Sequence, residues 1–172
     1  MFEKLRLAIV YALFAAIACQ AAPALAQAPK QDKQAAIAAR PGWVVMATPH
    51  AFAKLVERLE ATVTANKMGL VNAASASDGA KAQGFTIPGN RVVGVFRNDF
   101  ARRMLAASIP AGIEAPIRFY ITENANGAAT LSYRTPNAVF APYLKGAGAD
   151  LRKVAAELNV IFATIASEAA KP

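Results

Sequence analysis

Apolar side chains recur at helical spacing in two segments of this chain, and each segment predicts an amphipathic helix. Thr48 and Pro49 are expected to begin the first helix as its cap and first helical residue, and Gly69 to follow its end. Asp150 is expected to cap the second helix. The two apolar stripes are Phe52, Leu55, Val56, Leu59 and Val63, and Leu151, Val154, Leu158, Ile161, Phe162 and Ile165.

Shorter apolar runs predict five strands. Two of them flank Asn126-Gly127, a pair of residues that favours a tight turn, and so predict a hairpin. Within the strand expected at 91–97, residues 92–96 are apolar on both alternations, as in a central strand that is covered on both sides. The strands are expected at residues 43–47, 70–74, 91–97, 117–122 and 129–134.

Two short helices are expected between these strands. One is a single turn that begins near Ser77 and ends near Gly84, and the other covers residues 99–108 with Asn98 or Asp99 as its cap. Residues 135–148 are expected to be irregular and docked by their aromatic side chains. This order predicts an α+β domain, a two-layer sandwich of one mixed or antiparallel sheet of about five strands with helices mainly on one face.

The predicted hairpin has two chemically different faces. A three-residue loop at 125–127 pairs Asn124 with Ala128, so all large apolar residues share one face. On the other face, Tyr120 lies opposite Ser132, and Arg118 lies opposite Arg134. Like charges in opposite positions destabilise a sheet by up to about 1 kcal/mol.

Several groups would compensate this repulsion. Water and salt screen exposed charges. Other compensating groups are an internal carboxylate such as Glu114, a carboxylate of a second subunit, or an anionic ligand held by both guanidinium groups. The hairpin therefore makes Arg118, Tyr120 and Arg134 candidates for ligand binding.

The N-terminal segment is typical of a secretory signal peptide. Lys4 and Arg6 precede an apolar run at 7–18, which is too short to span a bilayer, and Ala24-Leu25-Ala26 matches a cleavage site. The predicted organisation is a signal peptide at 1–26, a linker or tail at 27–42 and a single domain at 43–170, without a transmembrane segment after cleavage. A lipoprotein that uses Cys19 is the alternative. The predicted location is periplasmic or secreted.

The charge of the chain matters only together with this location. The formal net charge is +8, from 19 basic and 11 acidic residues, of which Lys4, Arg6 and Glu3 lie in the signal segment. An exported basic protein meets acidic envelope components rather than nucleic acid. The only cysteine, Cys19, leaves with the signal, and His50 is the only histidine, so no zinc or copper site and no cofactor are predicted.

A second candidate anion site lies where the strand at 91–97 meets the following helix. Arg97, Asn98 and Asp99 stand there, close to free backbone amides. A capped and solvated helix start is the simpler interpretation, because Asp99 itself suits the positive end of the helix. Trp43 is assigned to the core or to a sheet edge.

The motifs of this chain resemble the domain of unknown function 302 family. The resemblance rests on residues 48–52, 96–98, 115–123, 126–127 and 131–133. It implies a compact two-layer α/β domain, often dimeric, with no established activity. Asn98, Glu123 and Tyr133 match the family pattern. Arg97 and Asp99 replace a glycine and a proline that are usual there, and residues 72–75 lack the acidic-histidine element.

Three functions therefore stay open. The favoured one is a periplasmic binding or interaction module, expected to be a homodimer, whose partner is a small anionic ligand or an acidic envelope component. The alternatives are a hydrolase-like or other enzyme that uses Glu123 and Tyr133 in a cleft, and a purely structural envelope protein. No catalytic residue is assigned. The candidate ligand-binding residues are Arg97, Asn98, Arg118, Tyr120, Glu123, Tyr133 and Arg134.

Overall fold

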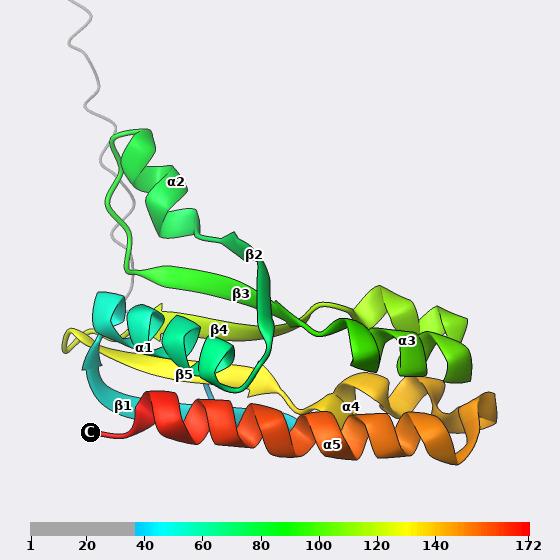
Figure 1. Ribbon diagram of the computed structural model, residues 1–172. Helices are drawn as coiled ribbons and strands as arrows, with labels where there is room; N and C mark the ends of the chain where they lie inside the picture. Colours follow the sequence, from blue (N-terminus) through cyan, green and yellow to red (C-terminus); the bar gives the residue numbers. More distant parts are fainter. Residues whose placement is uncertain (1–36) are drawn as a thin grey trace, which may run out of the picture. The chain divides into compact units, whose positions relative to one another are not determined.

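Five antiparallel strands form one sheet in the computed structural model, which describes residues 37–172 (Figure 1). Their order is β1-β5-β4-β3-β2, so β1 and β2 are the edge strands. The predicted α+β class and the five strands are confirmed, while the predicted signal peptide at 1–26 lies outside the described residues. The strands are β1 Trp43–Ala51, β2 Gly69–Ala74, β3 Asn90–Phe96, β4 Ile117–Glu123 and β5 Ala128–Arg134.

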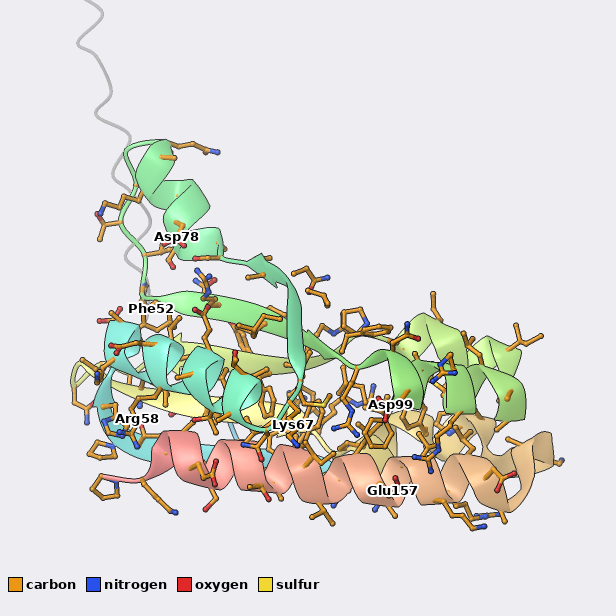
Figure 2. All side chains as sticks on the ribbon, viewed as in Figure 1. Phe52, Arg58, Lys67, Asp78, Asp99 and Glu157 are labelled. Carbon is orange, nitrogen blue, oxygen red and sulfur yellow. The ribbon has the colours of Figure 1, made fainter. Side chains whose placement is uncertain are left out.

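The helices pack mainly on one face of the sheet, as predicted. The helices α1 and α5 lie side by side over this face, and Arg58 of α1 lies beside the last turns of α5 (Figure 2). The helices α3 and α4 pack on the other half of α5, near one end of the sheet. The elements are α1 Phe52–Ala65, α2 Ala76–Ala82, α3 Asn98–Ala107, η1 Ile109–Glu114, α4 Pro136–Phe140, η2 Ala141–Tyr143 and α5 Leu144–Ala170.

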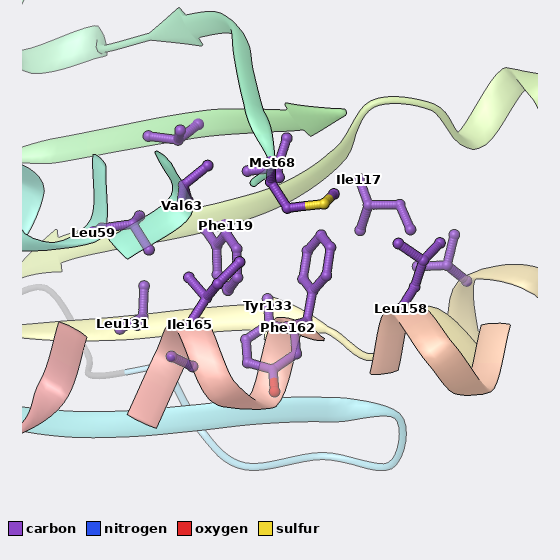
Figure 3. Packing of buried hydrophobic residues seen from close by; sticks show 14 of the residues in the cluster. Leu59, Val63, Met68, Ile117, Phe119, Leu131, Tyr133, Leu158, Phe162 and Ile165 are labelled. Carbon is purple, nitrogen blue, oxygen red and sulfur yellow. The ribbon is translucent and has the colours of Figure 1, made fainter. Parts of the chain in front are cut away.

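The core lies between this helical layer and the sheet. Phe119 pairs with Tyr133 across β4 and β5, as the hairpin loop predicts. The Phe119 ring stacks on Phe162 of α5 with ring centroids 4.7 Å apart, and it meets the Tyr133 ring at its edge at 5.0 Å (Figure 3). The hairpin and the last helix are therefore joined by one aromatic cluster.

The first helix begins later than its sequence predicts. Strand β1 continues through Ala51, which pairs with Ala128, and α1 starts at Phe52 without a side-chain cap. Thr48 is buried, and its hydroxyl donates to the carbonyl of Ala129 at 2.8 Å instead of capping a helix. The predicted start at Thr48-Pro49 is wrong because that hydroxyl serves the neighbouring strand.

Three other predicted boundaries are also wrong. Lys67, not Gly69, takes the left-handed conformation after α1, with φ 58°, and Gly69 opens β2. The cap of α3 is Arg97, without a side-chain hydrogen bond, because Asp99 is inside the helix and bonds Arg97. Helix α5 begins at Leu144, so Asp150 lies within it, and much of the segment expected to be irregular is helical.

Candidate functional site

The face of the sheet opposite α1 and α5 contains a cavity of about 780 Å³, which we call the open-face cavity. All five strands contribute to its wall, together with residues of η1, α2 and α4. Most of the lining side chains are apolar or aromatic, with arginine, serine and asparagine between them. The lining residues are Trp43, Ala74, Ser75, Ala76, Asn90, Val92, Glu114, Ile117, Arg118, Tyr120, Ser132, Tyr133, Arg134 and Val139.

Strand register explains which side chains share this face. Tyr120 of β4 pairs with Val92 on one side and Ser132 on the other. Arg118 pairs with Gly94, where the side chains of Asn72 and Pro116 occupy the space that a Cβ would take, and Arg134 pairs with Trp43 of the edge strand. The register therefore places Arg118, Tyr120, Ser132 and Arg134 together on the face that lines the cavity.

Arg118 and Arg134 bring two positive charges to this cavity. The hairpin ladder ends with the pair Phe119 and Tyr133, which puts the two arginines in the next positions on the opposite face. Arg134 donates through Nη2 to the carbonyl of Ala138 at 3.3 Å. Among residues 37–172, no carboxylate lies within 4.0 Å of either guanidinium group.

Glu114 is the only acidic residue among the described lining residues, and it bonds a tyrosine. The hydroxyl of Tyr143 donates to Oε1 of Glu114 at 2.8 Å. This bond raises the pKa of Tyr143 above its ordinary value, while the nearby Arg134 acts in the opposite direction. Glu114 therefore shares the cavity with both arginines without forming an ion pair with them.

Arg97 and Asn98, also predicted as site residues, lie elsewhere. They stand at the start of α3, where Arg97 donates to both carboxylate oxygens of Asp99 at 2.8 and 3.1 Å. The Arg97 guanidinium also lies 4.3 Å from the centre of the Phe100 ring. The hydrogen bond from Arg97 lowers the pKa of Asp99. The positive charge of Arg97 is therefore balanced by Asp99 and is not directed at the open-face cavity.

Glu123 and Tyr133 are not brought into one cleft. The Glu123 carboxylate accepts from the backbone amide of Gly89 at 2.7 Å, so it holds the turn before β3. Tyr133 contributes to the cavity wall, but its ring packs in the aromatic cluster, where burial raises its pKa. In register, Tyr133 pairs with Phe119 and Glu123 with Ala129, four residues or roughly 13 Å along the strand.

Trp43 is a cavity residue that the sequence did not identify. It lies on edge strand β1, as predicted, and it also forms part of the cavity wall. Arg40 lies over its ring at 4.1 Å. Its place in the wall depends on the pairing of β1 with β5, two segments about 90 residues apart in the sequence, and this pairing could not be predicted from local pattern.

Within residues 37–172, no helix has the length and apolar character needed to cross a membrane. In the same range, no cluster of three or more histidine, cysteine, aspartate or glutamate side chains could hold a metal ion.

Comparison with known proteins identifies the family. The family described as domain of unknown function DUF302 matches residues 44–165. The crystal structure of an uncharacterized conserved DUF302 protein from Bacillus stearothermophilus has the same fold, with a TM-score of 0.66 and 16% identity over 77% of this chain and 100% of that one. No curated protein matches. The chain, matched by the family over most of its length, belongs to the DUF302 family of domains of unknown function.

Proposed function

We propose that this protein is a binding module whose open-face cavity holds a small anionic molecule with an apolar or aromatic body. The observation that carries the proposal is that Arg118 and Arg134 line one cavity, and neither has a carboxylate partner among the described residues. Two guanidinium groups in one cavity favour a carboxylate or phosphate, which each can bind through two parallel hydrogen bonds.

The size and wall of the cavity support the apolar part of this ligand. A volume of about 780 Å³ is within the usual range for small-molecule sites. Trp43, Tyr120 and Val92 offer apolar or aromatic surface. Asn90 adds an amide to the wall, whose Oδ1 accepts from the amide of Ala76 and whose Nδ2 donates to the carbonyl of Pro88, leaving its second N–H for a neutral polar substituent.

The single tryptophan of the chain gives a direct measure of occupancy. Trp43 lines the cavity, so we expect a bound aromatic anion to change its fluorescence. A first screen uses phosphate, sulfate, nucleotides, dicarboxylates and aromatic monocarboxylates, and measures the melting temperature of the protein. A ligand that binds only the folded state raises this temperature.

Variants then locate the binding site. We expect Arg118→Ala and Arg134→Ala each to weaken binding of a hit about tenfold or more, because a hydrogen bond to a charged group contributes about 1.5–3 kcal/mol. Arg152→Ala, which removes an exposed arginine of α5 outside the cavity, is the matched control. If no anion shifts the melting temperature, or if all three variants bind equally, the proposal is wrong.

Export and dimer formation belong to the same proposal. The sequence of residues 1–26 supports export to the periplasm or beyond, and N-terminal sequencing of the secreted protein would show cleavage before Gln27. Edge strand β2 supports a homodimer, because it is exposed throughout and carries no charged residue to prevent strand pairing. Light scattering of the wild type and of Val71→Lys measures the mass, and a monomeric wild type would exclude the dimer.

A further inference from the structure

An exposed apolar surface lies at the junction of α3 and η1, outside the open-face cavity. Ile109 and Ile113 of η1 are 79% and 81% exposed, and Leu105 of α3 is 44% exposed. A Cβ on Gly112 would lie 2.9 Å from Leu105 Cδ2, so the helix and the turn are in contact. We call the exposed residues Leu105, Ala106, Ile109, Pro110 and Ile113 the α3–η1 tip.

The sequence around this tip has no charge over ten residues. From Met104 to Ile113 there is neither an acidic nor a basic side chain, although half of these residues are exposed. A soluble surface rarely leaves several large aliphatic side chains together in water without a partner. Protein interfaces usually contain aromatic residues, which this tip lacks.

Positive charges lie on the face of the tip and elsewhere at the same end of the sheet. Arg102 lies three and four residues before Leu105 and Ala106, so it shares their face of α3, and it is exposed. The start of α5 lies at the same end of the sheet as α3 and η1 (Figure 1), and it carries exposed Lys145 and Arg152. None of these three cations has a carboxylate within 4.0 Å among the residues that the structure describes.

The acidic side chains at this end already have partners. Arg97 pairs with Asp99 and Arg103 with Glu157. Within residues 37–172, the carboxylate of Glu114 is bonded only by the neutral Tyr143, and it keeps its single negative charge against the three unpaired cations. Asp150 lies 3.7 Å from Lys153. The excess charge around the α3–η1 tip is therefore positive.

We infer that the α3–η1 tip inserts into the surface of an anionic lipid bilayer. Its isoleucines would enter the boundary between headgroups and acyl chains, while Arg102 and the cations of α5 contact anionic headgroups. This surface recognises a lipid membrane and needs no ligand in the open-face cavity. It is therefore independent of the function proposed above.

Vesicle binding tests this inference. Residues 27–172 contain every described element, and the DUF302 structure shows that this fold forms without a further segment, since the whole of that chain is covered. This fragment avoids the apolar run at 7–18. We expect it to sediment with vesicles of phosphatidylcholine and phosphatidylglycerol, to bind pure phosphatidylcholine much less, and to be released by salt.

Substitutions separate the contributions of apolar and charged residues. We expect I109S/I113S to lower the partition coefficient at least tenfold, and Arg102→Gln to lower it about fivefold. Phe85→Ser is the matched control, because Phe85 is 60% exposed but follows α2, near the opposite end of the sheet (Figure 1). This control should bind as the wild type does.

A second readout does not depend on loss of binding. In a Trp43→Phe background, tryptophan introduced by Ile113→Trp should shift its emission to shorter wavelength with anionic vesicles, and that introduced by Phe85→Trp should not. The inference is overturned if the wild-type fragment does not bind anionic vesicles, or if I109S/I113S binds them unchanged. It is also overturned if that variant changes only the mass in light scattering, which would make the tip an interface between two copies.

Discussion

Arg103 of α3 and Glu157 of α5 form an ion pair with two parallel hydrogen bonds. Each guanidinium nitrogen, Nη1 and Nη2, donates to one carboxylate oxygen at 2.7 Å. Arg103 and Glu157 are 54 residues apart in the sequence, and their ion pair joins α3 to α5. It holds α3, and with it the adjoining η1, against the last helix.

This pair should make stability depend on pH. The hydrogen bond from Arg103 lowers the pKa of Glu157 in the folded protein. A lowered pKa contributes stability above the unfolded value, about 4.3, and this contribution is lost as the pH falls through the folded value. We expect Glu157→Gln to lower the urea midpoint at pH 7, modestly because both side chains are exposed, and to leave it unchanged near pH 2.

A pair within one helix provides the control for this prediction. Lys54 and Glu57 lie 3.0 Å apart on α1 and connect no two elements. We expect Glu57→Gln to change the urea midpoint less than Glu157→Gln at pH 7. An equal change in both variants would mean that Arg103 and Glu157 do not hold the two helices together.

Phe162 is the side chain on which the aromatic cluster depends. It is fully buried and stacks on Phe119 of the hairpin. We expect Phe162→Ala to destabilise the fold by about 3–5 kcal/mol, since it removes a large buried ring and leaves a cavity. Urea unfolding measures this loss, and Val160→Ala, at a position 67% exposed on the same helix, should stay within about 0.5 kcal/mol of the wild type.

The hairpin could be predicted from sequence because its determinants are local. Gly127 takes φ 80°, and the amide of Asn124 donates to the carbonyl of Ala128 at 2.7 Å, so the loop alone fixes the register. That register correctly predicts the apolar face with Phe119. It also puts Arg118 and Arg134 on the other face, which is why part of the candidate site could be found.

The boundaries and the rest of the site depend on distant partners. Thr48 has a good capping side chain, but its hydroxyl bonds Ala129, 81 residues away. The start of α5 has no apolar stripe and contains Gly146, whose φ of 94° departs from right-handed helical geometry. Helices α4 and α5 pack together, which is a contact that the sequence does not show. Trp43 lines the cavity because β1 lies next to β5 in the sheet, and the sequence does not reveal this strand order.

Arg58 satisfies the C-terminal end of α5. Its guanidinium donates to the carbonyls of Glu168, Ala169 and Lys171 at 3.0, 2.8 and 2.8 Å. Glu168 and Ala169 lie in the last turn of α5 and Lys171 is its C-cap, where backbone carbonyls lack a hydrogen-bond partner within the helix. We expect Arg58→Ala to cost about 1–2 kcal/mol and Arg58→Lys to cost less, because lysine keeps the charge but lacks the planar fork.

Urea unfolding and amide exchange distinguish this capping role from a general loss of charge. Exchange should accelerate most in the last turn of α5. Lys54→Ala removes a positive charge from the same helix as Arg58 and serves as the control. If exchange in that turn does not change in Arg58→Ala, the capping role is wrong.

Arg118 and Arg134 should oppose folding when the cavity holds no anion. They occupy neighbouring positions on one face, without a carboxylate partner within residues 37–172, so removing one charge relieves repulsion of up to about 1 kcal/mol. We expect Arg118→Ala to raise the free energy of unfolding in a low-salt buffer without phosphate or sulfate. Arg134→Ala should gain less, because it also loses the hydrogen bond to Ala138.

The stability gain of Arg118→Ala should depend on salt and on a bound anion. High salt screens the repulsion, so the gain of Arg118→Ala should shrink in 0.5 M sodium chloride, a concentration at which charges more than about 4–5 Å apart are largely screened. An anion that binds in the cavity should make the wild type more stable than Arg118→Ala, because only the wild type keeps both guanidinium groups for the ligand. Arg152→Ala should show neither change. A clear loss of stability in Arg118→Ala under all conditions would show that this arginine has a structural partner instead.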